Sequence, residues 1–545
     1  MLPRPSRTAS KFFLAILKLQ GSAISSHYSL LTWIGKMAKN LKTPKASKRK
    51  QLTLASVGLF LILMGLVMII VNPITILYRY RSRLTYGSAI YKLLEQRDSP
   101  GVTISAYLFN VTNGQEFLSG TDTKLKVEEV GPFTYLEQRS NENLEIDDVA
   151  RDVRYTPRTR VKFLPEESIG DPADVQVNMP NVAMLSMSSM LTSYPYFTQL
   201  GFNLLLTHLN SRPIVQQTAE EFLWGYDEPL IRLGNTVLPG WISFNTLGIM
   251  DRLYDNKVDY DLKVATENDN RFKIKSMNGL SGLKAWGYEE PNQRSSCNAF
   301  TDAYEGIGYP IDFPAGTPLK IFRNVLCRFL PLEYLGVQSL QDGVQGLTYR
   351  IRKDTFSINN QTECLCSRGI CIDGVSDLSP CFYDLPLALS NAHFLYANSS
   401  LYARIDGIKP DETKHGSVVI IEPKLGMVLK TTFSVQVNVV VKSVNFNKEA
   451  GRFSDMVVPV CHFKMAQPEL NAESKHNLKL LYLTVPYTMW TIVALIIFIG
   501  FFLVGYSIHL FLSNWIYSRS IIFQSEPEGS KANVMPAAVP LLSLR

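Results

Sequence analysis

Two apolar runs without Asp, Glu, Lys or Arg, one near each end, constrain what this chain of 545 residues can form. The first extends from Leu52 to Val71, and the second extends from about Val485 to Leu510. A helix rises about 1.5 Å per residue, so each run can cross the roughly 30 Å hydrocarbon core of a bilayer. Buried core helices are the alternative, but they are usually shorter and carry a polar stripe. The sequence therefore predicts transmembrane helices at residues 52–71 and 485–510.

The region between these runs, residues 72–484, is predicted to be one large β-rich domain with inserted helices. Alternating or β-branched segments bounded by turn residues predict strands. The clearest are residues 102–109, 124–130, 417–421 and 431–444. Asn113-Gly114 predicts a hairpin turn, because both residues tolerate positive φ. No internal repeat and no Pro/Ser linker divides the region into modules.

Charge and glycosylation signals predict on which side of the membrane this domain lies. Lysines and an arginine crowd residues 36–50 before the first run, which favours a cytosolic N-terminus, although three arginines at 79–83 act against this bias. Three glycosylation sequons, at Asn110, Asn360 and Asn398, all lie between the runs. We therefore expect residues 72–484 outside the cytosol, with cytosolic tails at 1–51 and 511–545.

Six of the seven cysteines cluster in the same region, which indicates an oxidising compartment. They are Cys297, Cys327, Cys364, Cys366, Cys371 and Cys381. A zinc site is the alternative, but the spacing lacks paired Cys-x-x-Cys units, so we expect no metal. Six cysteines allow fifteen pairings, and only the loop from Cys366 to Cys371 is locally favoured, because Gly369 lets the chain turn. Cys461 is expected to be a buried free thiol.

Residues 182–207 contain no charged side chain, which is unusual for a segment of this length. Met184, Met187 and Met190 recur at every third position and give one face of a predicted helix. The face could pack in the core, or it could belong to an exposed, lipid-contacting helical pair broken near Pro195. A third transmembrane span is disfavoured, because it would place Asn110 on the opposite side from the other two sequons.

No motif of an enzyme is present. The seven histidines show no H-E-x-x-H spacing, and the chain has neither a G-x-S-x-G motif nor a phosphate-binding loop. Acidic pairs such as Glu128-Glu129 are adjacent in predicted strands, so we expect them on opposite faces and in solvent. The net charge of +7 comes without a basic stripe, which excludes nucleic acid as a partner. We expect neither enzyme activity nor a cofactor.

Several short motifs occur in the order found in one receptor family. They are Gly131-Pro132-Phe133-Thr134-Tyr135, Leu223-Trp224-Gly225-Tyr226, Cys327-Arg328, His393-Phe394-Leu395-Tyr396-Ala397, Ile405-Asp406-Gly407, Glu422-Pro423 with Gly426, and Val435-Gln436-Val437-Asn438. With two terminal spans around a glycosylated domain, the chain resembles the class B scavenger receptors. This family includes fatty-acid translocase, the high-density-lipoprotein receptor and a lysosomal integral membrane protein. The resemblance covers about residues 52–512 and points to an invertebrate-type member.

The resemblance implies a fold for the domain. It is an α+β ectodomain with an antiparallel β-barrel core, a helical bundle at its apex and a hydrophobic tunnel through which lipids pass. The apex would be built partly from residues 182–210. The disulfide pattern of the family, carried to matching positions, implies the pairs Cys297–Cys364, Cys327–Cys381 and Cys366–Cys371.

The resemblance also implies a function. The expected protein is a cell-surface scavenger receptor that binds lipids, lipoproteins or lipid-bearing particles and passes hydrophobic ligands to the membrane. A dry tunnel would remove a cost of ~0.8 kcal/mol for each CH₂ exposed to water. The apex stretch is neutral up to His208 and Arg212, which favours neutral lipids or lipoprotein surfaces over fatty-acid carboxylates. The expected ligand contacts are Met184, Met187, Met190, Phe197 and Phe202.

Two other functions fit the same sequence. One is a recognition receptor for apoptotic cells or microbes that moves no lipid. The other is a lysosomal trafficking receptor, against which the dileucine Leu541-Leu542 lacks an acidic residue at position 537, which is Ala537. The expected location is the plasma membrane, with endosomal or lysosomal membranes as the alternative, and a homo-oligomer is compatible with the sequence.

Overall fold

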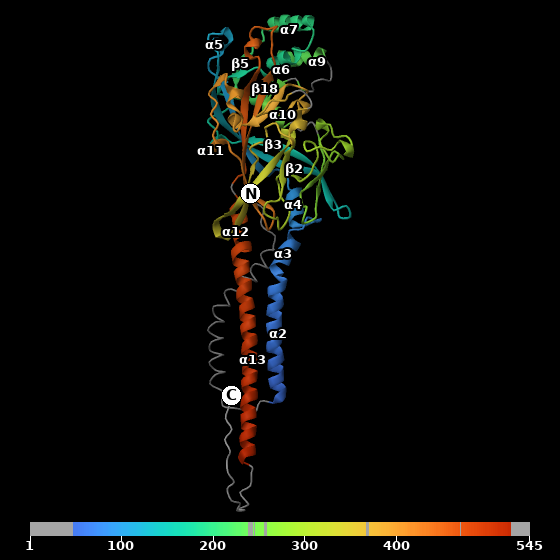
Figure 1. The fold of residues 1–545 in the computed structure, drawn as a ribbon, viewed down its shortest axis with the longest axis vertical. Helices are drawn as coiled ribbons and strands as arrows, with labels where there is room; N and C mark the ends of the chain where they lie inside the picture. The colour runs from blue at the N-terminus through green and yellow to red at the C-terminus, as the bar shows by residue number, and fades with distance from the viewer. Residues whose placement is uncertain are drawn as a thin grey trace, which may run out of the picture. The chain divides into compact units, whose positions relative to one another are not determined.

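The computed structural model describes residues 47–237, 244, 246–254, 259–366, 370–468 and 470–524. Most of the predicted tails, including Leu541-Leu542, lies outside these residues. The chain divides into two compact units (Figure 1). Residues 1–73 with 487–545 form the first unit, which contains the apolar runs, and residues 74–486 form the second.

Two helices in the described part of the chain are long and apolar enough to cross a membrane. Helix α2 spans Lys48–Val71, and the second candidate span covers Ala472–Ile516, with helix α13 at Val485–Gln524. Both predicted spans are thus confirmed as helices, and both helices continue into polar residues beyond the predicted limits. Residues 182–207 form two shorter helices instead of a third span.

Within the first unit, α2 and α13 pack closely through small residues. A Cβ added to Gly58 would lie 2.7 Å from the carbonyl oxygen of Gly500, and one added to Gly65 would lie 2.4 Å from Ile497 Cγ1. Near one end of the pair, the hydroxyl of Ser507 donates to the carbonyl oxygen of Gln51 at 2.8 Å. Such close backbone approach is the usual basis of helix association in membranes, where lipid tails are as apolar as leucine.

The second unit is built around one large sheet, which has fifteen strands among the described residues. Twelve strands follow one another as β10-β11-β12-β13-β17-β18-β19-β1-β2-β3-β8-β9. In that order they span Ala303–Tyr304, Leu319–Arg323, Arg328–Ser339, Gln345–Ile351, Val418–Glu422, Met427–Val441, Met456–Ala466, Ser99–Val111, Leu125–Asp147, Asp152–Phe163, Leu262–Ala265 and Ile274–Met277. The short strands β14 (Ser376–Asp377), β15 (Leu387–Asn391) and β16 (Ile405–Asp406) pair beside this path.

The sheet is a nearly closed antiparallel barrel. Along the path, each pair of neighbours is antiparallel except β10 with β11. Next to β9, Lys273 forms a bridge with Tyr304 of β10, so the two ends of the path meet. Closure removes the exposed strand edges that would otherwise pair with other chains. The predicted β-barrel core is confirmed.

Strand β18 contains most of the run that was predicted at residues 431–444. It is buried on both faces from Phe433 to Val441, which explains its nearly continuous valine content. One face packs in the main core, while Val440 belongs to a second, smaller core with Phe394 and Val457. The turn around Phe394 is therefore part of the segment that covers the other face of β18.

The described helices of this unit lie in the connections between strands and at the ends of the sheet. They are α3 (Pro73–Arg81), α4 (Ala89–Glu95), α5 (Gly114–Ser119), α6 (Val182–Leu191), α7 (Tyr196–Leu209), α8 (Ala219–Trp224), α9 (Pro229–Val237), α10 (Ile249–Leu253), α11 (Glu412–His415) and α12 (Ala472–Lys479). Two hairpins, β4 (Gln176–Pro180) with β5 (Ile214–Thr218) and β6 (Tyr226–Asp227) with β7 (Thr246–Leu247), accompany them. Figure 1 shows α7 at the end of this unit opposite α3 and α12, the helices next to the two apolar runs. This end, formed by α6 and α7, is the apex.

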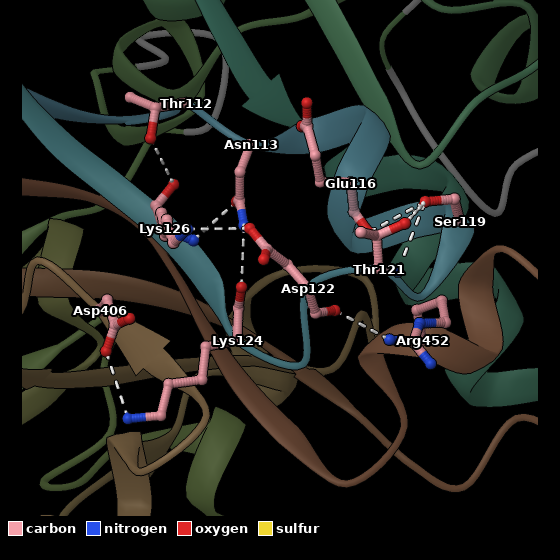
Figure 2. Close-up of polar contacts among 10 residues, drawn as sticks. All are labelled: Thr112, Asn113, Glu116, Ser119, Thr121, Asp122, Lys124, Lys126, Asp406 and Arg452. Atoms are coloured by element: carbon pink, nitrogen blue, oxygen red, sulfur yellow. Dashed lines mark hydrogen bonds and ion pairs between the residues drawn. The ribbon is translucent and has the colours of Figure 1, made fainter.

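The connection between β1 and β2 is not the predicted two-residue hairpin turn at Asn113-Gly114. Asn113 has a φ of −123°, and Gly114 begins the short helix α5. Figure 2 shows the reason: the Asn113 amide donates to Asp122 Oδ2 at 2.7 Å and to the Lys124 carbonyl at 2.9 Å. It also accepts from the Lys126 N–H at 2.8 Å. These bonds fix a longer connection, which a local propensity argument did not foresee.

Three disulfides lie within the second unit. They join Cys297 to Cys364, Cys327 to Cys381 and Cys366 to Cys371. The pairs are the same as those implied by the family resemblance. Cys461 on β19 is a buried free cysteine, and burial raises the pKa of its thiol.

Candidate functional site

The helical pair at the apex forms for local reasons that the sequence shows. Asn181 caps α6, because its side-chain oxygen accepts from the Met184 N–H at 2.9 Å. Pro195 precedes α7, where its fixed φ suits the start of a helix. Asn210 ends α7 in the left-handed conformation, with a φ of 50°. The break predicted near Pro195 is therefore the boundary between the two helices.

Helix α6 is mostly a core element. Met184 is 1% exposed, while Met187 and Met190 are half-buried against the core. The Ser189 hydroxyl donates to the Val440 carbonyl at 2.9 Å and accepts from the Lys442 N–H at 2.9 Å, which attaches α6 to β18. The methionine face thus packs toward the core beneath the surface of the apex, and Met184 is not accessible to a ligand.

Helix α7 presents apolar side chains to solvent. Its inner face is held by Phe202 and Leu206, which are 7% and 3% exposed. We define the apex patch as Tyr194, Tyr196, Phe197, Leu200 and Leu204, which are 40% to 83% exposed, with Phe197 the most exposed. Of the five predicted ligand contacts, only Phe197 is in this patch. The residues Tyr194, Tyr196, Leu200 and Leu204 were missed, although the lack of charge in residues 182–207 pointed to the region.

The apex helices carry no net charge of their own. No Asp, Glu, Lys or Arg occurs between residues 182 and 207. Arg212, the next cation along the chain, forms an ion pair with Glu449 at 2.6 Å. An exposed apolar surface without charge favours contact with apolar ligands over anions.

A narrow apolar pocket adjoins the start of α6. It is lined by Val182, Phe244, Leu247, Ile249, Arg252, Leu253, Leu378, Phe382, Tyr383, Leu385, Leu387 and Val437. The guanidinium of Arg252 lies 4.5 Å from the ring centroid of Phe244. The space left for a water-sized molecule is only about 30 Å³, so the pocket holds about one water as it stands.

Two of the predicted glycosylation sites are open to solvent. Asn360 and Asn398 are exposed, and the Asn398 side-chain oxygen accepts from the Ser400 N–H at 3.0 Å. Asn110 is half-buried, and its side-chain oxygen accepts from the Asn178 N–H at 2.7 Å. In Asn110 and Asn398 the amide nitrogen, to which a glycan would be attached, is not the atom that forms these bonds.

Sequence reasoning missed two charged clusters in the second unit. Inside the sheet, Arg139 and Glu305 form a bidentate ion pair at 3.0 and 2.8 Å. Elsewhere, Glu129 accepts hydrogen bonds from His393 and His462. Glu128 and Glu129 are both exposed, as expected, but the Glu129 carboxylate also contacts two buried histidines, which was not foreseen. The partners lie 166 and more than 260 residues apart, so no local pattern could have predicted them.

Comparison with known proteins agrees with this architecture. The family model described as CD36 family matches residues 56–511. Scavenger receptor class B member 1 of Bos taurus is 26% identical over 426 residues, covering 77% of this chain and 81% of that protein. Lysosome membrane protein 2 of Rattus norvegicus is 27% identical over 425 residues, covering 76% of this chain and 85% of that protein. Since the family model spans both apolar helices and the barrel between them, the chain belongs to the CD36 family.

Proposed function

We propose that this scavenger receptor of the CD36 family captures neutral lipids or lipoprotein surfaces through its apex patch and passes hydrophobic ligands toward the membrane. The observation that carries the proposal is the uncharged, exposed apolar face of α7. Like other receptors of the family, the chain is not an enzyme.

The energetics of the apex patch favour an apolar ligand. Burial of apolar surface contributes about 25 cal/mol per Å², and full burial of one Phe or Leu side chain contributes about 1.5–3 kcal/mol. Four exposed apolar or aromatic side chains on α7, with Tyr194 just before it, give a surface that gains more from contact with lipid than with water. A free carboxylate would find no lysine or arginine on α6 or α7 to bind.

We further propose that residues 72–484 lie outside the cytosol at the cell surface. Three observations support this orientation: the sequons fall in this region, six cysteines of the region are paired, and the basic residues at 36–50 precede the first span. On this orientation the apex faces the extracellular medium, where lipid particles are met.

The test replaces two exposed side chains of the apex patch. Cells that express Phe197→Ser together with Leu204→Ser are compared with wild type for uptake of a fluorescent cholesteryl ester from lipid particles. Each substitution removes an apolar side chain that would be buried against the lipid particle, and each such contact contributes more than about 1 kcal/mol to binding. Uptake should therefore fall about tenfold or more.

The matched control is Val149→Ser, in the turn between β2 and β3. Val149 is 95% exposed and lies outside the apex, so its loss should leave uptake unchanged. Surface expression is measured for each variant. Equal uptake by the apex variant and wild type at equal expression would rule out capture through this patch.

A lysosomal trafficking receptor is the second candidate, because a lysosomal membrane protein and a surface scavenger receptor resemble the chain equally well. The steady-state location of the full-length protein separates the two. Accumulation in lysosomes would favour the second candidate over the surface receptor.

A further inference from the structure

Three histidines and one glutamate from separate elements meet beside the barrel. Glu129 lies on β2, His393 in the turn after β15, His415 at the end of α11 and His462 on β19. The Nε2 atoms of His393 and His462 lie 2.7 and 2.8 Å from the same Oε2 of Glu129. The His415 ring stacks on His393 with centroids 4.4 Å apart. We call these four residues the histidine cluster.

The hydrogen bonds define where the protons of the cluster lie. The backbone N–H of Lys409 donates to Nδ1 of His393 at 3.1 Å. Nδ1 therefore carries no proton, and the neutral His393 ring donates its Nε2 proton to Glu129. His462 donates to the same carboxylate oxygen, because an ionised carboxylate can only accept.

The same bond argues against a metal ion. Glu129, His393 and His415 do place ligand atoms within 4.8 Å of one another. A histidine that binds a metal through one nitrogen normally donates its other N–H to an acceptor. In His393 that other nitrogen faces the Lys409 N–H, which is a donor. The geometry of His393 is therefore that of a neutral hydrogen-bonding ring, not of a metal ligand.

Within the part of the chain that the structure describes, each of the three rings has one nitrogen that faces no acceptor. His393 Nδ1 faces the N–H of Lys409, and the Nδ1 atoms of His415 and His462 are buried without a partner among the described residues. A protonated imidazole has two N–H donors, and a buried donor without an acceptor is costly. Protonation thus favours arrangements in which the rings separate and reach water.

The surrounding charges can compensate one added proton but not several. The charged and titratable side chains that face the rings are Tyr107 on β1, Glu129 on β2, Asp411 at the start of α11 and Lys464 on β19. The carboxylates favour a positive ring and the lysine opposes it, while β18 adds only the uncharged Gln436. Glu129 is 35% exposed, so protons from solvent can reach the cluster.

The pKa shifts agree with this geometry. Burial, together with His393 and His462, lowers the pKa of His415 to about 4. Burial also lowers the pKa of His462. Burial opposes ionisation of Glu129, but hydrogen bonds from His393 and His462 hold its pKa below the usual value. The closed cluster therefore binds fewer protons than an open one with histidines near 6.5. It is most stable above pH 6.5 and loses stability as pH falls toward 4.

The segment that carries His393 depends on contacts for its shape. His393, Phe394 and Tyr396 all have left-handed backbone angles, with φ of 52°, 54° and 71°. The His393 N–H donates to the side-chain oxygen of Gln436 on β18 at 2.7 Å. Such a segment relaxes when its contacts are lost, because its local preference is for other angles.

We propose that the histidine cluster is a proton-sensitive latch, which holds residues 392–415 against β2, β18 and β19 at neutral pH and releases them in acid. A receptor that moves from a neutral surface to an acidic compartment would loosen at this place. The latch does not depend on lipid being the ligand.

The test is hydrogen exchange of the full-length protein in lipid nanodiscs at pH 7.4 and pH 5.0, corrected for the intrinsic pH dependence of exchange. Peptides within residues 392–415 should lose protection from exchange about tenfold or more in acid. A histidine whose pKa differs by one unit between the closed and open states changes the equilibrium between them about tenfold. Peptides from β1 should change much less.

Two variants remove the titrating rings in different ways. His415→Phe keeps a ring to stack on His393 but cannot be protonated, and His462→Gln keeps a donor for Glu129. Each should reduce the loss of protection in acid to a few-fold or less. The control His476→Gln, an exposed histidine of α12, should behave as wild type.

The wild-type protein alone can overturn the proposal, even if one variant fails to fold. Protection of residues 392–415 that is equal at both pH values would contradict the latch. So would an equal loss in wild type and in a folded variant. A gain of protection on addition of Zn²⁺ at pH 7.4 would show instead that the cluster binds metal.

Discussion

At the scale of single residues, the barrel contains a buried charge pair whose members depend on each other. Arg139 binds Glu305 through its two terminal guanidinium nitrogens, and the Tyr155 hydroxyl donates to Glu305 Oε2 at 2.7 Å. Burial alone would raise the pKa of Glu305, but Arg139 holds it below the usual value. The pair is tolerated in the interior because each charge is neutralised and hydrogen-bonded.

Glu305→Gln should therefore be strongly destabilising. The substitution leaves the Arg139 charge buried without a counter-ion, which typically costs about 3–5 kcal/mol. We expect a corresponding fall in the free energy of unfolding, measured by urea denaturation in detergent micelles. The control Glu333→Gln removes the ion pair between Glu333 and Arg350, whose atoms lie 2.9 Å apart and whose side chains are both partly exposed. That change should cost about 0–1 kcal/mol, and equal costs in the two variants would contradict this account.

Residue roles were only partly predictable from the sequence. The clustering of six cysteines indicated disulfides, but apart from the loop from Cys366 to Cys371 their pairing came only from the family resemblance. The role of Glu129 could not be predicted, because its two histidine partners lie far along the chain and the fold alone brings them together. Phe197 and Phe202 could not be told apart either, since the uncharged stretch shows no clear periodicity that would separate an exposed face from a buried one.

At the scale of elements, α2 and α13 illustrate how two apolar helices recognise each other. Gly58 and Gly500 allow the backbones to approach, while many apolar side chains on other faces, such as Phe60 and Phe498, are exposed. Without a hydrophobic difference between lipid and helix, the fit of the small residues decides the packing.

Gly58→Leu should push these helices apart. An added side chain would meet Gly500 and Val504 within 2.8 Å, an overpacking that costs about 1–3 kcal/mol. Disulfide cross-linking between Gln51→Cys and Ser507→Cys, which lie side by side, reports the packing. We expect a clear loss of cross-linking. The control Gly505→Leu, with no atom near its added Cβ, should retain it, and retention in both variants would count against this packing.

Elements were the most predictable level of the structure. The strands β1, β2, β17 and β18 were found from alternation and β-branched content, and the α6–α7 pair from Pro195. The turn at Asn113-Gly114 was predicted wrongly, because the hydrogen bonds of the Asn113 side chain with Asp122, Lys124 and Lys126 outweigh the local preference. Periodicity reports burial, whereas turn geometry also depends on tertiary contacts.

At the scale of the whole molecule, the chain combines a pair of apolar helices with a barrel unit that carries an apolar patch on α7 and at Tyr194 just before it. The sequence predicted this plan because long uncharged runs have few alternatives. The family resemblance implied a barrel, but the order of its strands was not predicted, since pairing partners such as β1 and β19 lie more than 300 residues apart. Lipid transfer further requires a path, for which the pocket beside α6 is the candidate entrance.

The most direct test of lipid transfer is to fill that pocket without altering the apex patch. Leu253→Trp places a larger side chain in the wall of the pocket. The control Leu118→Trp makes the same substitution at a half-buried leucine of α5, which does not line the pocket. Cells with equal surface expression are compared for particle binding and for uptake of a fluorescent cholesteryl ester. We predict that Leu253→Trp binds particles as wild type does but takes up much less lipid, while Leu118→Trp retains both. Unchanged lipid uptake by Leu253→Trp would contradict transfer through this pocket and favour a receptor that only recognises its particles.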